Sequence, residues 1–409
     1  MKLKIRDYKA RNGWRFSLLF DTEGDGFPLF YPTAYMSSRN DSLMFNTQRV
    51  MLSFLKKLYA WADTRRIDLE HRFSTKDLLS APEVDSLVFA LATNTKKNDG
   101  SSIMSRKLNY GIEVVADYFG YLFDYRITDP NKDSNRQLIE SLKAMLTARK
   151  RKTPSKAREK RRRLEKRLDE KAEGVLLQLF REYERDEANA SLTLFQRSIA
   201  FRNILALRIL FDTGMRIGEL LSLKYTHFIP GRGGDHAYLQ IERNHDDKFD
   251  RRMNQPVAKT VGRRLPITPD LENMINIYMG TYRSEIPNVG FEDESFIFVN
   301  HKAGENQGLE IEFSTFRSAW SEIRKREPKL SGVHPHLLRH HWNYKFSVSA
   351  TERGLSDEQT RIERELWMGW SAGSESARDY DMRHIQESAF KHGLEIASHT
   401  ARNKEDRKQ

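Results

Sequence analysis

The chain of 409 residues contains no cysteine. Disulfide bridges, thiolate metal ligands and a cysteine nucleophile are therefore excluded. No uninterrupted apolar run approaches the roughly 20 residues that a membrane-spanning helix needs. Residues 1–20 also lack the apolar core of a secretory signal peptide. We therefore expect a soluble protein of a reducing compartment, the cytoplasm, with no membrane partner.

Basic residues outnumber acidic residues in the chain. The chain has 69 Lys and Arg residues against 57 Asp and Glu, a net charge of +12 and a pI near 9.5. This excess favours an anionic partner, either nucleic acid or an anionic membrane surface. A hydrophobic content of 38% is enough for packed cores and excludes a disordered basic tail. The length predicts two or three domains.

Most of the excess charge lies in one segment. Between Arg149 and Arg167, twelve residues are basic and two are acidic, a net charge of +10. Such a run cannot be buried, so residues 131–167 are predicted to be a basic linker that begins with a short helix. We expect it to follow the phosphate backbone of DNA, whereas a merely soluble linker is the alternative. The predicted contacts are Arg149, Lys150, Arg151, Lys152, Arg161, Arg162 and Arg163.

Residues 1–37 are predicted to form a β-hairpin. Residues 14–20 are strand-like, residues 21–26 form a polar turn, and residues 28–35 are predicted to be extended. The hairpin is either a ribbon that reads DNA or a flap that packs on its neighbour, and we favour the flap.

Residues 38–130 are predicted to form a compact helical domain. Apolar residues recur at near-helical spacing from Phe45 to Thr64. Ser80 and Glu83 form the pattern of a capping box at the start of a second helix. A third periodic stretch runs from Ser101 to Phe123, and we interpret its aromatic residues as core.

Residues 168–392 are predicted to form a second domain, and residues 393–409 a polar tail. The predicted order is helices, a small antiparallel sheet and helices again, so the fold class is mainly α with a small sheet (α+β). No 20–50-residue repeat is present. The helices are expected at residues 174–183, 199–211, 215–223, 269–282 and 313–327, and the strands at residues 236–242, 264–268 and 294–299.

The segment from His334 to His341 contains four histidines and one arginine in eight residues. His336 and Arg339 are three residues apart, so on a helix they lie on the same face. An imidazole and a guanidinium directed at one point suit a phosphate, because arginine binds it through two parallel hydrogen bonds. A helix start with incidental histidines is the alternative.

Three further elements fit a phosphate site. Gly214 permits a sharp turn that exposes Arg216 at a helix start, where anions are favoured, and Glu219 can hold that guanidinium. The segment from Ala258 to Arg264 forms a predicted basic hairpin tip that can enter a groove. Its cationic residues are Lys259, Arg263 and Arg264. The third element is Gly369-Trp370, followed by Tyr380.

Arginine, lysine, His-x-x-Arg, Gly-Trp and tyrosine in this order resemble the tyrosine recombinase (phage integrase) family. The resemblance covers residues from about 165 to 390, and residues 38–125 more weakly resemble its helical, SAM-like core-binding domain. It implies that Arg216 and Arg339 bind the phosphate, Lys259 is the general acid, and His336 serves as acid or base. Trp370 takes a position where many members have histidine, Tyr380 is the implied nucleophile, and Glu219 supports the first arginine.

The chemistry agrees with these roles. Two arginines stabilise the charge that develops on the non-bridging oxygens, so no metal or other cofactor is expected. Tyrosine, with a pKa near 10 in water, needs a group that takes its proton. We interpret Asp246, Asp247 and Asp250 as solvated loop residues rather than metal ligands.

The sequence departs from the family pattern in three places. Trp370 cannot transfer a proton as histidine does. The segment between Arg339 and Trp370 is longer than usual, and Tyr-x-His is absent around Tyr380. Tyr344 and Lys248 are the rivals of Tyr380 and Lys259.

The resemblance implies a site-specific integrase that acts on attachment-type sites in duplex DNA. It also implies a homotetramer with docked C-terminal tails, accessory DNA-bending or directionality proteins, and a nucleoid-associated location in the cytoplasm. A type IB topoisomerase and a catalytically inactive DNA-binding regulator are the alternatives. An intact set of catalytic residue types argues against the regulator.

Overall fold

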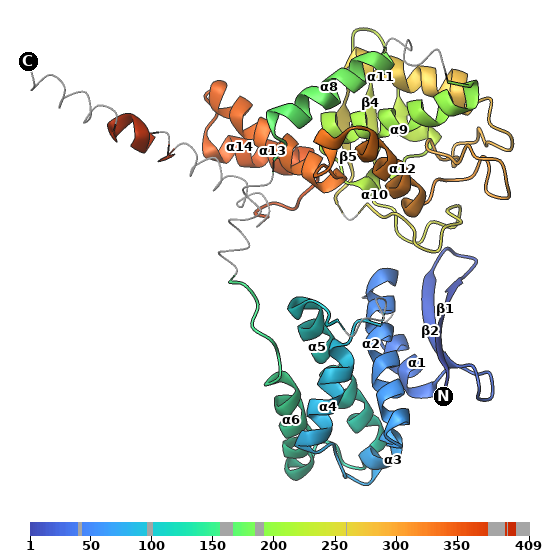
Figure 1. Cartoon of the computed structure of the whole chain (residues 1–409), viewed down its shortest axis with the longest axis vertical. Helices are drawn as coiled ribbons and strands as arrows, with labels where there is room; N and C mark the ends of the chain where they lie inside the picture. Colours follow the sequence, from blue (N-terminus) through green and yellow to red (C-terminus); the bar gives the residue numbers. More distant parts are fainter. Residues whose placement is uncertain are drawn as a thin grey trace, which may run out of the picture. The chain divides into compact units, whose positions relative to one another are not determined.

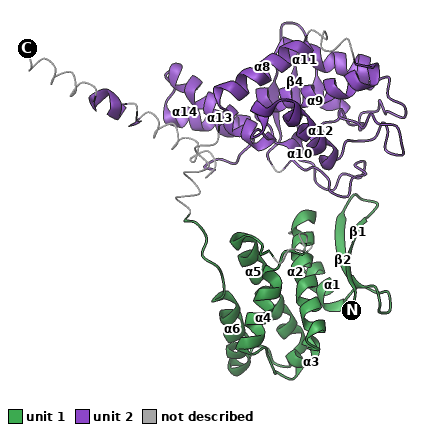
Figure 2. Ribbon diagram, viewed as in Figure 1, with its two compact units in different colours: residues 1–155 green, residues 156–409 purple. Residues whose placement is uncertain are grey.

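The structure is a computed structural model that describes residues 1–39, 43–95, 101–155, 167–184, 192–258, 260–374, 389–390 and 392–397. The chain divides into two compact units, Met1–Ser155 (unit 1) and Lys156–Gln409 (unit 2), each with its own hydrophobic core (Figure 2). The division falls inside the segment predicted to be the linker. No helix among the described residues is both long and apolar enough to cross a bilayer.

The hairpin of unit 1 forms with the predicted strand at residues 14–20, but its partner strand precedes that strand instead of following it. β1 (Leu3–Lys9) pairs antiparallel with β2 (Arg15–Asp21). The turn lies at Asn12-Gly13, where Gly13 has a φ of 93° and the Asn12 side chain accepts from the Trp14 N–H. The Gly13 N–H donates to Ala10 O at 3.0 Å, so this is a three-residue hairpin loop that ends in a glycine with positive φ. The predicted extended segment at residues 28–35 is wrong, since α1 is a helix at Phe30–Ser37.

One face of this hairpin packs on the helices, as the flap interpretation predicts. Leu3 and Leu19 belong to the core of unit 1, and both strands contact α2 (Phe45–Thr64). Asp7, on the same face, pairs with Arg49 of α2 at 3.2 Å.

The remaining elements of unit 1 are helices around one core (Figure 1). The capping box is confirmed, because the Ser80 N–H donates to Glu83 Oε2 at 2.7 Å. The last helix occupies the start of the predicted linker and packs on the preceding one, so the first part of that segment belongs to unit 1. The helices are α3 (Leu69–Ser74), α4 (Ala81–Ala92), α5 (Ser105–Arg126) and α6 (Asp133–Thr147).

Unit 2 confirms a mainly helical fold with a small antiparallel sheet. The predicted strand at residues 294–299 consists only of isolated bridges. The helices are α8 (Glu170–Glu184), α9 (Leu194–Thr213), α10 (Ile217–Leu221), α11 (Pro269–Ile277), α12 (Phe313–Arg326), α13 (Pro335–Glu352) and α14 (Asp357–Met368). Shorter helical turns are η2 (Tyr225–His227), η3 (Tyr278–Arg283) and η4 (Pro328–Leu330).

The sheet of unit 2 has the order β3 (Phe228–Ile229), β4 (Tyr238–Ile241) and β5 (Arg263–Pro266). Leu239 of β4 pairs with Leu265 of β5, and both side chains are fully buried in the core. The sheet therefore has an apolar face that anchors both ends of the β4–β5 connection.

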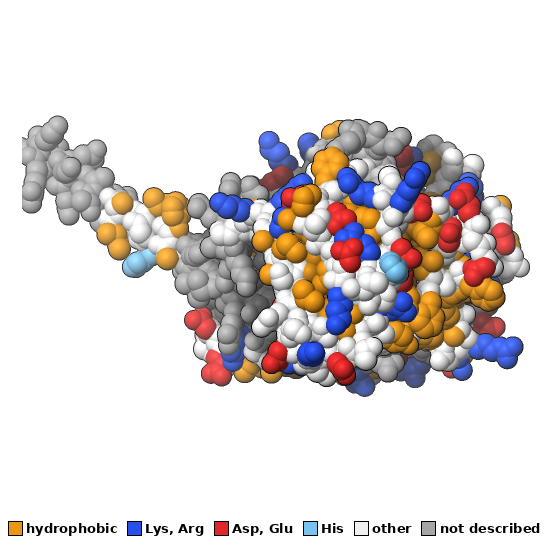
Figure 3. Space-filling view, turned by 90° about the horizontal axis from the view of Figure 1, so that it is seen from below, with side chains coloured by type: hydrophobic (Ala, Val, Ile, Leu, Met, Phe, Trp, Pro, Cys, Tyr) orange, Lys and Arg blue, Asp and Glu red, His pale blue; other side chains and the backbone are white. Residues whose placement is uncertain are grey.

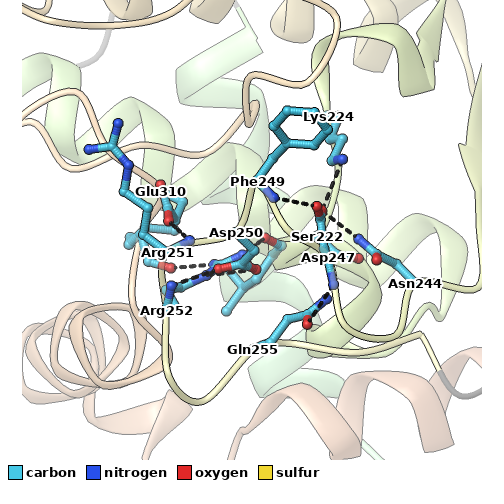
Figure 4. A network of polar contacts seen from close by, with 12 residues as sticks. Ser222, Lys224, Asn244, Asp247, Phe249, Asp250, Arg251, Arg252, Gln255 and Glu310 are labelled. Carbon is cyan, nitrogen blue, oxygen red and sulfur yellow. Dashed lines mark hydrogen bonds and ion pairs between the residues drawn. The ribbon is translucent and has the colours of Figure 1, made fainter. Parts of the chain in front are cut away.

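That connection spans residues 242–262, and a buried polar network holds it in place (Figure 4). Asp247 accepts from the side chain of Asn244 and the N–H of Phe249, and it pairs with Lys224 at 2.9 Å. Asp250 is fully buried and pairs with Arg252 at 2.7 Å. The interpretation of Asp247 and Asp250 as solvated residues is therefore wrong, because cations in the folded chain compensate both.

Candidate active site

The turn between α9 and α10 is the centre of the candidate site. Gly214 ends α9 in the left-handed conformation, with φ 63°. A Cβ atom at this position would lie 2.8 Å from Trp342 Cγ and 3.0 Å from Met368 Cε. Glycine is therefore required for both conformation and space. The turn places Arg216 at the N-cap of α10.

Three side chains donate hydrogen bonds to the carbonyl oxygens at the end of α9. These oxygens have no N–H partner within the helix. Trp342 Nε1 donates to Asp212 O at 2.8 Å, and Trp367 Nε1 donates to Thr213 O at 2.9 Å. Arg339 Nη1 donates to Gly214 O at 2.7 Å. The two indole rings stack with centroids 5.2 Å apart. We call Trp342, Trp367 and Arg339 the carbonyl clamp; it joins the end of α9 to the first half of α13 and to the end of α14.

Arg339 is almost fully buried and also lies beside Trp370. Its Cζ atom is 5.3 Å from the Trp370 ring centroid, a cation–π distance. The backbone N–H of Trp370 caps α14 by donating to Glu365 O at 2.9 Å. The predicted second arginine and the predicted tryptophan are therefore adjacent, one on α13 and one just after α14.

The four histidines of the His334–His341 segment have four different surroundings. His334 caps α13, with its Nδ1 accepting from the Leu337 N–H. His336 is exposed, and its ring lies edge-on to that of buried His340, with centroids 4.5 Å apart. His341 Nε2 lies 3.4 Å from Glu173 Oε1 of α8. Of the four, His336 is the one that solvent reaches most freely.

Glu219 lies under Arg216 and has no exposed side-chain surface. It accepts from the Arg216 N–H at 2.9 Å, while the Arg216 guanidinium is 3.6 Å away. Its stronger partners are Thr260 Oγ1 at 2.6 Å and Arg263 Nη2 at 2.9 Å. Burial alone would raise the pKa of Glu219, but the charge and hydrogen bonds of Arg263 outweigh it and hold the pKa below its usual value.

Arg263, predicted to contact DNA, points inward and is 7% exposed. Its Nε donates to Trp367 O at 2.5 Å. The same turn is held to the end of α14, because the Val261 N–H donates to Gly369 O. Gly369 has φ 64°, and a Cβ there would lie 2.8 Å from both Val261 O and Arg263 Nη1. Only glycine permits this approach.

Two of the predicted catalytic residues, Lys259 and Tyr380, lie outside the described residues. The neighbours of the lysine on either side, Ala258 and Thr260, are both buried. Among the rivals, Tyr344 packs under Arg167, whose Cζ is 4.8 Å from the ring. Lys248 is exposed and lies over Phe249 at 4.8 Å.

The other predicted DNA contacts fall into two groups. Arg264 is exposed on β5, with its Cζ 5.0 Å from the Tyr238 ring. The second group follows α6 on unit 1 and is already paired: Arg149 with Asp85, Lys150 with Glu113, and Arg151 with the side chain of Ser102. Lys152 is exposed, and Arg161, Arg162 and Arg163 lie outside the described residues.

Cationic side chains are not gathered into one block on the face shown in Figure 3, where they lie among apolar and acidic ones. The excess charge of the chain is therefore not expressed as a single patch on that face.

Sequence reasoning missed Thr260, Trp342 and Trp367. Two signals were present in the sequence. Both tryptophans lie within a few residues of predicted site residues, and a glycine (Gly214 or Gly369) shortly precedes both Arg216 and Trp370. Neither signal reveals that the indole N–H groups bind carbonyls of a helix more than a hundred residues earlier.

The chain matches the model of the phage integrase family over residues 181–350. No curated protein sequence matches it. The XerH site-specific recombinase bound to its difH substrate, in the pre-cleavage complex, is 13% identical with a TM-score of 0.40, covering 88% of this chain and 94% of that one. The Tn1549 transposon integrase (residues 82–397) in complex with circular intermediate DNA is 12% identical with a TM-score of 0.47, covering 87% and 98%.

The family match spans the α9–α10 turn, the β4–β5 connection and most of α13, so it includes Arg216 and Arg339. The chain therefore contains, at residues 181–350, a domain of the phage integrase (tyrosine recombinase) family.

Proposed function

We propose that the enzyme cleaves and rejoins DNA at defined sites through a 3′-phosphotyrosyl intermediate. The Tyr380 oxygen attacks a phosphodiester and forms a bond to phosphorus while the bond to the 5′ oxygen breaks. His336 receives the tyrosine proton, and Lys259 gives a proton to the leaving 5′ oxygen. Attack by a 5′ hydroxyl of another strand reverses these steps, so neither ATP nor a metal is consumed.

The observation that carries this proposal is the α9–α10 turn. Arg339 binds the carbonyl of Gly214, and Arg216 follows two residues later. One turn thus fixes the backbone under both guanidinium groups, although they come from α13 and from the start of α10. Two fixed cations at one phosphate stabilise the charge that builds on its non-bridging oxygens.

The surroundings of the other groups agree with their proposed roles. His336 is exposed, so a substrate can reach its ring, and the buried His340 ring restricts its rotation. Trp370 packs against Arg339 and can offer one indole N–H, but it cannot transfer a proton. Proton transfer therefore depends on His336 and Lys259.

Duplex DNA is the substrate that this chemistry requires. We assign contact with the phosphate backbone to the basic segment from Arg149 to Arg167 and to Arg264, and location to the cytoplasm, at the nucleoid. Exchange between two duplexes requires four protomers, so we also propose a homotetramer with docked C-terminal tails. Accessory DNA-bending or directionality proteins would select integration or excision.

Covalent trapping tests the proposal. The full-length protein is incubated with fragmented DNA from its source and denatured in detergent, and the DNA linked to protein is sequenced. We expect adducts at one sequence that disappear in Tyr380→Phe. Tyr344→Phe is the matched control, because its ring contacts Arg167 in the fold, and adduct formation should persist.

The alternatives give different outcomes in this assay. Adducts spread over many sequences would identify a topoisomerase-like enzyme without a defined site. DNA binding without any adduct would contradict the catalytic proposal and favour a regulator on this fold.

A further inference from the structure

The guanidinium of Arg263 forms its hydrogen bonds inside the protein rather than at its surface. Its Nη1 and Nη2 donate to the two oxygens of Glu219 at 3.3 and 2.9 Å, a bidentate arrangement. Nη1 also donates to Thr260 Oγ1 at 3.0 Å, and Nε donates to Trp367 O. Each nitrogen of the guanidinium is therefore hydrogen-bonded within the protein.

We propose that Arg263 is a positioning residue that holds the Glu219 carboxylate and so leaves Arg216 available to the DNA phosphate. This inference rests on the proposed function, since it assigns Arg216 to the phosphate. Arg263 itself touches neither DNA nor the reacting atoms.

The geometry shows a competition for Glu219. A carboxylate with no exposed surface needs a cation as partner, because an uncompensated charge in the interior is strongly unfavourable. Arg263 satisfies this need in the interior, whereas Arg216 Nη1 remains 3.6 Å from the carboxylate and the Arg216 side chain is 36% exposed. The buried arginine therefore takes the carboxylate, and the partly exposed Arg216 keeps the longer distance from it.

Arg263 also connects the parts of the site. Through Glu219 it reaches the start of α10, through Thr260 it reaches the turn that follows residue 259, and through Trp367 O it reaches the end of α14. Loss of its side chain would leave Glu219 with Arg216 as the nearest cation. The Arg216 guanidinium would then move onto Glu219 and away from the phosphate.

The test compares four full-length proteins: wild type, Arg263→Gln, Glu219→Gln and the double variant. Covalent adduct formation is measured in single turnover at saturating DNA. We expect Arg263→Gln to lower the rate about 100-fold, as a small misplacement of a catalytic group does. In the Glu219→Gln background the same substitution should lower the rate of adduct formation by less than about threefold, because the neutral amide no longer attracts Arg216.

A second readout separates positioning from DNA contact. The slope of log Kd against log salt falls by about 1 when a phosphate contact is lost. We expect Arg263→Gln to leave this slope unchanged. Arg264→Gln, at the neighbouring exposed arginine, is the matched variant for a phosphate contact and should reduce it.

Several results would overturn the proposal. One is a salt slope reduced by Arg263→Gln as much as by Arg264→Gln. Another is an equal loss of rate in both Glu219 backgrounds. If Arg263→Gln alone does not fold, the double variant removes both buried charges and allows the comparison with Glu219→Gln. Absence of adducts from wild type would instead refute the proposed function, while the salt slopes still report on Arg263.

Discussion

The interiors of the two units differ in their chemistry. Tyrosines aside, the buried polar side chains among the described residues of unit 1 are Arg15, Ser17, Gln48 and Asn135. The interior of unit 2 contains many charged groups, several of them in the site or next to it. They include Arg202, Glu219, Asp250, Arg252, Arg283, Arg339 and Arg364.

This difference reflects what each interior does. The core of unit 1 only has to hold helices together, and apolar packing does so at no electrostatic cost. In the function proposed for unit 2, cations are fixed at a phosphate, and fixed cations need buried partners such as Glu219 and helix carbonyls. Buried charge is weak evidence for stability, because the cost of desolvation can exceed the attraction, and the proposed function gives a reason for it in this unit.

The largest expected effect comes from breaking a buried ion pair of unit 2. Asp250→Asn would leave Arg252 as an uncompensated buried cation, which costs about 3–5 kcal/mol of the free energy of unfolding. Urea unfolding combined with hydrogen exchange, read peptide by peptide, should localise the loss to unit 2. Asp246→Asn is the control, because this neighbour is exposed. Equal losses in both variants would contradict the contrast between the interiors.

The next effect depends on pH. Burial, together with Arg202 and Arg283, lowers the pKa of His301 from 6.5 to about 3. The histidine is neutral in the fold and protonates more readily when unfolded. The contribution of neutral His301 to the free energy of unfolding is therefore complete above pH 6.5. It is lost as the pH falls toward 3, by up to about 1.4 kcal/mol per pH unit. Urea unfolding of wild type and His301→Gln across this range measures it, and identical slopes would refute it.

The smallest effect tests packing in unit 1. A Cβ on Gly111 of α5 would lie 2.2 Å from the Phe54 ring of α2. Gly111→Ala should therefore destabilise unit 1 by about 1–3 kcal/mol, despite the better helix propensity of alanine. Gly120→Ala, on the same helix, would meet only the flexible end of Lys143 and should be neutral or stabilising. Thermal unfolding compares the two, and Phe54→Leu should restore the stability of Gly111→Ala.

Sequence patterns predict the parts of the fold that local interactions determine. The helix from Phe45 to Thr64 has the predicted ends, and the Ser80–Glu83 capping box forms because both residues belong to one turn. The hairpin was misplaced because two turn-forming segments compete, and the Asn12-Gly13 turn prevails over residues 21–26.

Burial that depends on distant contacts is not predictable in this way. Asp250 resembles a solvated loop residue until Arg252 is seen bound to the carbonyls of Leu221 and Ile311. Arg263 and Arg264 are adjacent in a strand, so the sequence shows that they point to opposite faces but not which one points inward. That Glu219 lies beside Arg216 could be predicted, because the two residues belong to one helical turn. The catalytic roles of Arg216 and Arg339 stay predictions.

The carbonyl clamp has a consequence for the order in which the molecule matures during synthesis. The donors to Asp212, Thr213 and Gly214 follow them in the chain by 130, 154 and 125 residues. At roughly 5–20 residues per second, a ribosome needs on the order of ten seconds or more to supply them. Unit 1 is complete long before that time. A nascent chain therefore carries its helical unit well before the carbonyl clamp can form, and products truncated before α13 lack all three of its donors.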